Sequence, residues 1–309
     1  MRPLLSVRDI VRVYEIRRTV FSFKKEPIRA VDHVSFELEK GHTMGVVGES
    51  GSGKSTLARC IARLEEPDSG TVFFQGKDWV NLRGRELKAE RKEMQIIFQD
   101  PYSSLNPRKK VIDIIAEPLV AHDLAPKDGL RDAVVEILKN VGLDEDFLTK
   151  YPHEMSGGQR QRVAIGRALS TSPAFIIADE PVSALDVSVQ AQIINLFLDI
   201  RERSDISMLF ISHDLNIVRF VSDSIMVMYR GKVVEMAEAD DLFECPLHPY
   251  TRMLVETVRE GALSRDEIGG PPSACVFYDR CPDRQPVCQG AAPVLSGTNG
   301  HLVACHLAG

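Results

Sequence analysis

Short hydrophobic runs separated by polar turns dominate the pattern along this chain. Four of these runs are unbroken, at 44–47, 96–98, 174–178 and 208–211. A strand covered on both faces reads as a continuous apolar run, so these segments predict central strands of a parallel sheet. Val34, Phe36 and Leu38 alternate with polar residues, which predicts a strand with one buried face.

Other stretches have different spacing. Residues 4–16 alternate loosely and predict a strand, 71–75 predict one arm of a hairpin, and the charged, irregular residues 17–29 predict a loop. From about 111 to 150 the spacing is helical, with Gly142 as a suitable stop. We therefore expect a helical subdomain, about 101–155, inserted into an α/β core with a largely parallel sheet.

The apolar run 44–47 leads into a glycine-rich turn and then a helical segment. The turn and the start of that helix consist of Gly48, Glu49, Ser50, Gly51, Ser52, Gly53, Lys54, Ser55 and Thr56. This is the G-x-x-x-x-G-K-S pattern in a strand–turn–helix setting, where backbone N–H groups converge on an anion. Lys54 can reach the β- and γ-phosphates and the Ser55 hydroxyl can ligate Mg²⁺, so the stretch predicts a site for a nucleoside triphosphate such as ATP.

Composition narrows the class of protein. The chain has 309 residues, a formal charge of −6 and 6% aromatic residues, which argues against a nucleic-acid partner. No apolar run approaches the roughly 20 residues that span a bilayer, and charged residues interrupt the N-terminus. We expect a cytosolic protein whose cysteines are thiols or ligands.

Further motifs follow the P-loop in a fixed order. They are Gln99 after a strand, the stretch 156–159, Asp179-Glu180 at the end of a strand, the turn 183–186, and His213. This ordered set resembles the ATP-binding subunit of an ATP-binding cassette (ABC) transporter over about residues 4–260. The resemblance implies a RecA-like parallel sheet with an antiparallel β subdomain in a domain of residues 1–260. The rival class, a soluble cassette ATPase of DNA repair or translation, is disfavoured by the single cassette and the acidic balance.

The resemblance implies a role for each motif. Glu180 would polarise the attacking water as a base, and His213 would contact the γ-phosphate. Gln99 would bind Mg²⁺ or water, and Asp179 and Ser55 would complete the Mg²⁺ site. The expected catalytic and metal set is therefore Glu180, His213, Gln99, Asp179 and Ser55.

Two further nucleotide contacts are implied. Tyr14 would stack on adenine. Ser156, Gly157, Gly158 and Gln159 form a second anion-binding turn at a helix N-terminus. In the resembled family, this turn closes over the γ-phosphate held by the P-loop of a second subunit, so that ATP joins a head-to-tail dimer. Met155 stands where the family usually has leucine, a swap that conserves volume.

A finer resemblance is to the ATPases of oligopeptide, dipeptide and nickel importers. It rests on 99–107, on 151–154 and on 246–251. The long loop before Val31 is similar to the paralogue often designated F-type. The resemblance implies a heterodimer with a second homologous ATPase, two transmembrane permease subunits and an extracytoplasmic solute-binding protein. The chain would then lie peripherally on the cytoplasmic side of the plasma membrane and serve peptide import, with nickel-chelate import as the alternative.

The last segment, 261–309, has a different composition and holds four of the six cysteines: Cys275, Cys281, Cys288 and Cys305. Little apolar sequence surrounds them, so a cross-link or metal would help this extension to fold. The residues leave disulfides, zinc and a [4Fe–4S] cluster open, although a cytosolic setting disfavours disulfides. The importer resemblance implies the [4Fe–4S] cluster, with zinc as the alternative.

Overall fold

The computed structural model describes residues 3–16, 26–260 and 274–308. The chain forms two compact units. Unit 1 contains Met1–Leu38, Thr43–Val80 and Ile211–Gly309, and unit 2 contains Glu39–His42 and Asn81–Phe210. Each unit is described separately.

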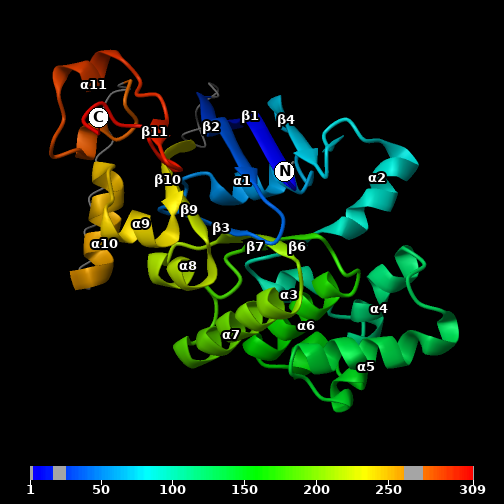
Figure 1. Ribbon diagram of the computed structural model, residues 1–309. Coiled ribbons are helices and arrows are strands. Elements are labelled where there is room, and N and C mark those ends of the chain that lie inside the picture. Colours follow the sequence, from blue (N-terminus) through cyan, green and yellow to red (C-terminus); the bar gives the residue numbers. More distant parts are fainter. Residues whose placement is uncertain (1–2, 17–25, 261–273, 309) are drawn as a thin grey trace. The chain divides into compact units, whose positions relative to one another are not determined.

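An antiparallel sheet forms the first part of unit 1, with strand order β2-β1-β4-β5 (Figure 1). Its strands are β1 (Leu5–Ile16), β2 (Glu26–Leu38), β4 (Ser69–Phe74) and β5 (Lys77–Asp78). Leu5, Val7 and Ile10 of β1 are buried, with at most 1% of their surface exposed. The β4–β5 pairing confirms the predicted hairpin. The predicted loop 17–29 is wrong at its end, because Glu26–Arg29 belong to β2 and pair with β1. Residues 17–25 lie outside the described residues.

Five further strands of unit 1 are sheet neighbours in the order β11-β12-β10-β9-β3. The β3–β9 pair is parallel and the β9–β10 pair is antiparallel. Every residue of β3 is buried, as its unbroken apolar pattern predicts. The elements are β3 (Thr43–Val47), α1 (Lys54–Ile61), α8 (Leu215–Val221), β9 (Ser224–Tyr229), β10 (Lys232–Glu238), α9 (Ala239–Glu244), α10 (Pro249–Glu260), the 3-10 turn Tyr278–Arg280, α11 (Pro286–Gly290), β11 (Ser296–Thr298) and β12 (His301–Val303).

Unit 2 contains the strands β8, β7 and β6, in this order, and a group of helices (Figure 1). β6 and β7 are parallel, and every residue of β7 and β8 is buried, as the sequence predicts. The main elements are α2 (Gly84–Glu90), β6 (Met94–Ile97), α3 (Pro101–Ser104), α4 (Val111–Ala121), α5 (Leu130–Asn140), α6 (Gly157–Leu169), β7 (Phe175–Asp179), α7 (Val187–Arg203) and β8 (Ser207–Ile211). Short 3-10 turns are Arg91–Glu93, Lys127–Gly129, Glu145–Thr149 and Pro152–Glu154.

A glycine ends α5, as its sequence position predicts. Gly142 has φ +70°, a conformation that other residues rarely adopt, and a Cβ there would lie 2.8 Å from Nη1 of Arg162. The same Nη1 donates a 2.6 Å hydrogen bond to the Val141 carbonyl. Arg162 therefore joins the end of α5 to α6.

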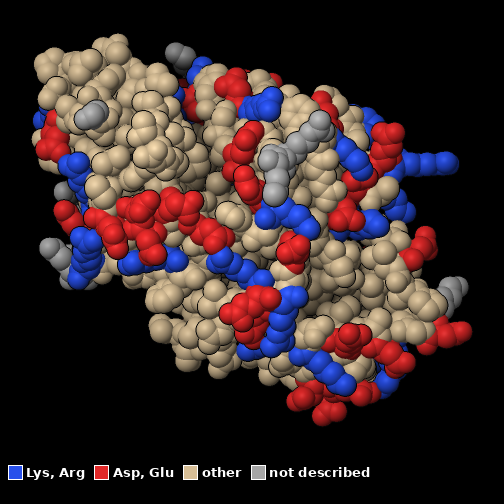
Figure 2. Space-filling model, in the orientation of Figure 1, with Lys and Arg blue, Asp and Glu red and all other residues tan. Residues whose placement is uncertain are grey.

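We call residues 274–308 the C-terminal lobe. From Gln285 to the end, the sequence has no Lys, Arg, Asp or Glu. The lobe accordingly presents a face with few charges in Figure 2, whereas acidic and basic side chains are interspersed over unit 2. Within the described ranges, no helix combines the length and apolarity needed to cross a bilayer.

Candidate active site

Two glycines of the P-loop have no room for a side chain. Gly48 has φ +152°, and a Cβ there would lie 2.1 Å from the Met228 carbonyl oxygen. Gly53, the residue before α1, has φ +102°, and its Cβ would lie 2.0 Å from the Ala30 carbonyl oxygen. Since both contacts are with backbone, neither neighbour can move away cheaply. Only glycine fits the shape that turns the loop from β3 into α1.

Lys54 is folded back onto the loop that precedes it. Its Nζ donates hydrogen bonds to the carbonyl oxygens of Gly48 and Glu49, at 2.7 and 3.0 Å, and to Ser52 Oγ at 3.3 Å. The side chain is only 4% exposed. The ammonium group is therefore held beside the loop at the positive N-terminal end of α1, a setting that suits a triphosphate.

Tyr14 on β1 lies close to the same helix. Its hydroxyl is hydrogen-bonded to Glu65, and it also interacts with Thr56. The Arg12 guanidinium lies over the ring, 5.0 Å from its centroid. Burial, followed by the bond to Glu65, raises the pKa of Tyr14. Sequence reasoning did not identify Glu65, because no motif marks it.

In unit 2, the structure brings two of the predicted catalytic residues together. Gln99 Nε2 donates a 3.2 Å hydrogen bond to Glu180 Oε2. Asp179, 4% exposed, is the last residue of β7, and Glu180 follows it with φ +47°. A positive φ at a residue other than glycine costs on the order of 1–3 kcal/mol and is concentrated at functional sites. The Ser183 hydroxyl donates to the Glu180 carbonyl at 3.1 Å and so stabilises this turn.

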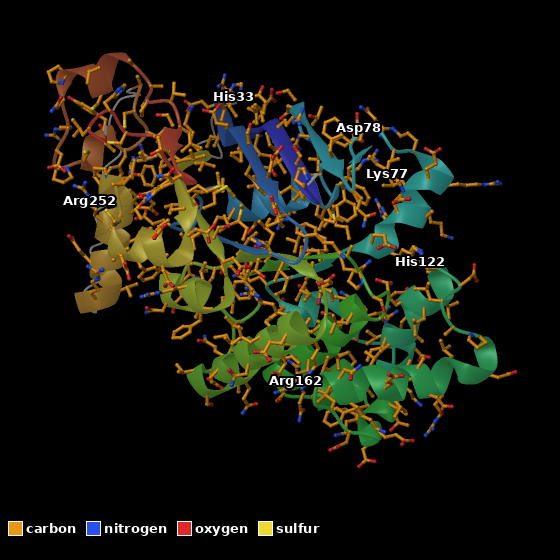
Figure 3. All side chains as sticks on the ribbon, in the orientation of Figure 1. His33, Lys77, Asp78, His122, Arg162 and Arg252 are labelled. Carbon is orange, nitrogen blue, oxygen red and sulfur yellow. The ribbon has the colours of Figure 1, made fainter. Side chains whose placement is uncertain are left out.

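The turn before α6 has the geometry of a capping box. Ser156 Oγ accepts from the Gln159 N–H at 3.3 Å, and Gln159 Oε1 accepts from the Ser156 N–H at 3.0 Å. Gly158 packs so closely on α7 that a Cβ would lie 2.4 Å from Val189 Cγ1, while Ser156 is exposed. Beside the turn is a cavity of about 340 Å³ that Arg162, labelled in Figure 3, helps to line.

His213 belongs to unit 1 and is exposed, two residues after the end of β8. Asp214 caps α8, because its Oδ1 accepts from the Asn216 N–H at 2.9 Å. Unit 1 therefore carries the P-loop, Tyr14 and His213. Unit 2 carries the residues Gln99, Asp179, Glu180 and 156–159.

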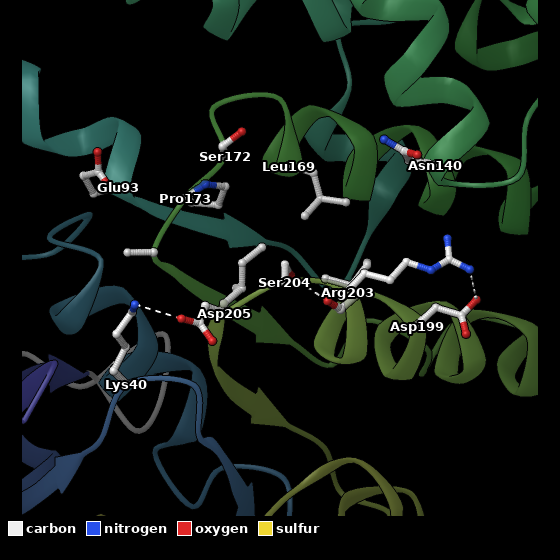
Figure 4. A pocket seen from close by; sticks show the side chains of 13 residues that line it. Lys40, Glu93, Asn140, Leu169, Ser172, Pro173, Asp199, Arg203, Ser204 and Asp205 are labelled. Atoms are coloured by element: carbon white, nitrogen blue, oxygen red, sulfur yellow. Dashed lines mark hydrogen bonds and ion pairs between the residues drawn. The ribbon is translucent and has the colours of Figure 1, made fainter.

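A separate cavity of unit 2, about 540 Å³, holds none of the predicted site residues (Figure 4). Four of the charged side chains that line it form two pairs: Lys40 Nζ is 2.9 Å from Asp205 Oδ2, and Arg203 Nη2 is 3.9 Å from Asp199 Oδ2. These pairs are exposed and contribute little to stability. The cavity is not a candidate for the nucleotide site.

The prediction of a [4Fe–4S] cluster in the C-terminal lobe is wrong. The described residues include all four cysteines, and they contain no group of three or more His, Cys, Asp or Glu side chains arranged to hold a metal ion. The same finding counts against the zinc alternative. Burial raises the pKa of Cys275 and of Cys281, which favours the thiol over the thiolate that binds metals.

The lobe is stabilised by packing on the rest of unit 1. Phe277, 2% exposed, lies 5.2 Å from the Tyr229 ring and 5.4 Å from the Tyr250 ring, between centroids. His301 Nε2 is 2.7 Å from Oε1 of Glu235, a fully buried residue of β10. The lobe therefore shares an existing core, which removes the reason for expecting a metal.

Comparison with known proteins agrees with this geometry. The family model "ABC transporter" matches residues 31–183. The oligopeptide transport ATP-binding protein AppF of Bacillus subtilis (strain 168) is 46% identical over 319 residues, covering 98% of this chain and 97% of the relative. The chain belongs to the ABC transporter family. A second model, "Oligopeptide/dipeptide transporter, C-terminal region", matches residues 234–288 of this ABC ATPase.

Two further similarities concern a relative and a solved structure. The di/tripeptide transport ATP-binding protein DppF of Pseudomonas aeruginosa (strain UCBPP-PA14) is 42% identical, covering 99% of this ABC ATPase and 98% of the relative. The dimeric post-hydrolysis structure of the ATP-binding cassette MJ0796 bound to ADP and Pi has a TM-score of 0.67 and 29% identity. It covers 76% of this chain and 98% of that one. The predicted α/β cassette fold is thereby confirmed.

Proposed function

We propose that this ABC ATPase hydrolyses ATP to power the import of peptides. The observation that carries the proposal is the match of residues 234–288 to the C-terminal region of oligopeptide and dipeptide transporters. Relatives that match nearly the whole chain are named for oligopeptide and di/tripeptide transport. This region lies outside residues 31–183, which the general ABC transporter model matches, so the two matches rest on different parts of the chain.

We assign the chemistry to the following residues. The P-loop, with Lys54 and the glycines beside it, binds the triphosphate, and Tyr14 stacks on the adenine. Glu180 polarises the attacking water, and the hydrogen bond from Gln99 orients its carboxylate. His213 stabilises charge on the γ-phosphate.

The proposed metal site uses oxygen donors only. Ser55 offers a hydroxyl, Gln99 an amide oxygen and Asp179 a carboxylate, which are the ligands that Mg²⁺ prefers. Bound Mg²⁺ supplies charge neutralisation at the phosphate oxygens. Asp179 supplies the compensating negative charge from the end of a fully buried strand.

The proposed assembly follows from the second anion-binding turn. Ser156 is exposed at the N-terminus of α6, a 13-residue helix, and Gly157 and Gly158 add further N–H groups there. We assign this turn to the nucleotide on the P-loop of a second, homologous ATPase, which makes a heterodimer. Two permease subunits and an extracytoplasmic binding protein complete the importer, with this chain on the cytoplasmic side of the membrane.

A reconstituted transporter tests the proposal. The chain is purified with the subunits that accompany it from membranes and placed in proteoliposomes with its binding protein, and uptake of a labelled tripeptide is measured. Native protein should require ATP for uptake, and Lys54→Ala should lose it. Lys139→Ala, at an exposed position near the end of α5, is the matched control. ATP-dependent uptake of another solute, with no uptake of peptides, would contradict peptide import.

A further inference from the structure

An acidic residue lies inside the P-loop, and a distant arginine holds it. Nη1 of Arg280, in the C-terminal lobe, donates to both carboxylate oxygens of Glu49, at 2.9 and 2.8 Å. The two residues are 231 positions apart in the sequence. The Arg280 side chain is 10% exposed and the Glu49 side chain 42%. Such a charge-assisted contact is among the stronger hydrogen bonds in proteins.

The guanidinium is fixed from several sides. It lies 5.8 Å from the ring centroids of Tyr229 and Phe277, and its Nη2 is 3.7 Å from Met253 Sδ. The bond to Glu49 raises the pKa of Arg280, so the charge persists at any working pH. Since these neighbours hold Arg280 in one place, it can restrain Glu49 without being ordered by a ligand first.

A second contact restrains the backbone at the same position. The hydroxyl of Tyr250, a fully buried residue of α10, accepts a 2.9 Å hydrogen bond from the Glu49 N–H. Burial raises the pKa of Tyr250, so the hydroxyl remains protonated. The side chain and the backbone of Glu49 are therefore both held by the region after residue 248, which is outside the nucleotide-binding motifs.

The charge at this position bears directly on phosphate binding. Glu49 follows Gly48, whose carbonyl oxygen accepts from Lys54 at 2.7 Å. Lys54 also donates to the backbone carbonyl oxygen of Glu49 itself, at 3.0 Å, so the carboxylate belongs to a residue that the lysine contacts. Left uncompensated, this negative charge in the loop would weaken the attraction between the loop and a triphosphate. Arg280 supplies the compensating charge.

We propose that Arg280 is a positioning residue that neutralises Glu49 and thereby allows the P-loop to bind Mg-ATP tightly. The proposal rests on the ATP-binding role assigned above. The C-terminal lobe then has a function at the nucleotide site, because its Arg280 neutralises the negative charge of Glu49 in the P-loop.

The test compares the affinity of full-length variants for Mg-ATP by calorimetry. Arg280→Gln should weaken binding about tenfold, since a unit charge next to a polyanion has an effect of this order in partly hydrated surroundings. The double variant Arg280→Gln with Glu49→Gln should recover to within about twofold of native, because the repelling charge is gone. Raising the salt concentration should shrink the defect of the single variant. Arg284→Gln, an exposed arginine of the same lobe, is the matched control.

Native affinity in Arg280→Gln, or a double variant as weak as the single one, would overturn the proposal, since packing alone predicts no rescue. If Arg280→Gln does not fold, Glu49→Gln alone decides: it should bind Mg-ATP at least as tightly as native, and weaker binding contradicts charge neutralisation. Failure of the native chain to bind Mg-ATP would instead overturn the proposed function, so the two failures are distinguishable.

Discussion

Replacing Glu180 by glutamine removes one charge and preserves the local structure. The carboxylate accepts a 3.2 Å hydrogen bond from Gln99 Nε2, and an amide oxygen can accept the same bond. The positive φ of +47° is equally costly for glutamine and glutamate, so the folded state should lose less than about 0.5 kcal/mol. The effect should therefore fall on the chemical step.

Loss of a general base lowers the rate by about 10²- to 10⁴-fold, or about 3–5.5 kcal/mol in activation free energy. The assay is phosphate release at saturating Mg-ATP by the assembled transporter, together with the Kd for Mg-ATP. Glu180→Gln should keep the native Kd and accumulate bound ATP. Glu136→Gln, an exposed glutamate on α5, should match native protein in both measurements. A kcat within threefold of native would remove Glu180 from the role of base.

Three further outcomes are expected. Gly53→Ala should abolish Mg-ATP binding in a calorimetric titration, because its Cβ would lie 2.0 Å from a backbone oxygen; native affinity would show that the loop can relax. Burial lowers the pKa of His248 from 6.5 to about 4. Between these pH values, the unfolded chain binds a proton at this histidine and the folded chain does not. Stability is therefore fully present above pH 6.5 and declines towards pH 4 by up to about 3 kcal/mol. Urea unfolding monitored by the single tryptophan, Trp79, should show this decline and a smaller one in His248→Gln; equal declines would refute it. Finally, EDTA should stop ATP hydrolysis by removing Mg²⁺ without lowering the thermal stability of the C-terminal lobe, and a destabilised lobe would mean that a metal holds it.

Local sequence patterns predict much of the fold. The apolar runs of β7 and β8 predict fully buried strands because a parallel sheet needs both faces covered. The start of α6 can also be predicted from the sequence, because the side chains of Ser156 and Gln159 each accept a hydrogen bond from the other's backbone N–H, within four residues of chain. The first half of β2 cannot be predicted from the sequence. Its side chains are largely exposed, so apolar and polar residues do not alternate there, although the backbone pairs with β1.

Contacts between residues far apart in the sequence cannot be predicted from local patterns. The Arg280–Glu49 pair has no local signature, and neither does the packing of Phe277 on Tyr229 and Tyr250. The iron–sulfur prediction is wrong for the same reason: contacts between distant residues leave no local pattern in the sequence. The lobe has little apolar sequence of its own, and its stability comes from a core contributed by residues earlier in the chain.

The proposed sharing of the nucleotide site between two subunits is tested most directly by determining the structure of the assembled transporter with Glu180→Gln and Mg-ATP. Ser156 of this chain should contact the γ-phosphate of the nucleotide on the partner's P-loop, while the partner's equivalent turn contacts the nucleotide beside Lys54. A nucleotide enclosed by one subunit alone, with Ser156 facing solvent, would contradict the proposed assembly.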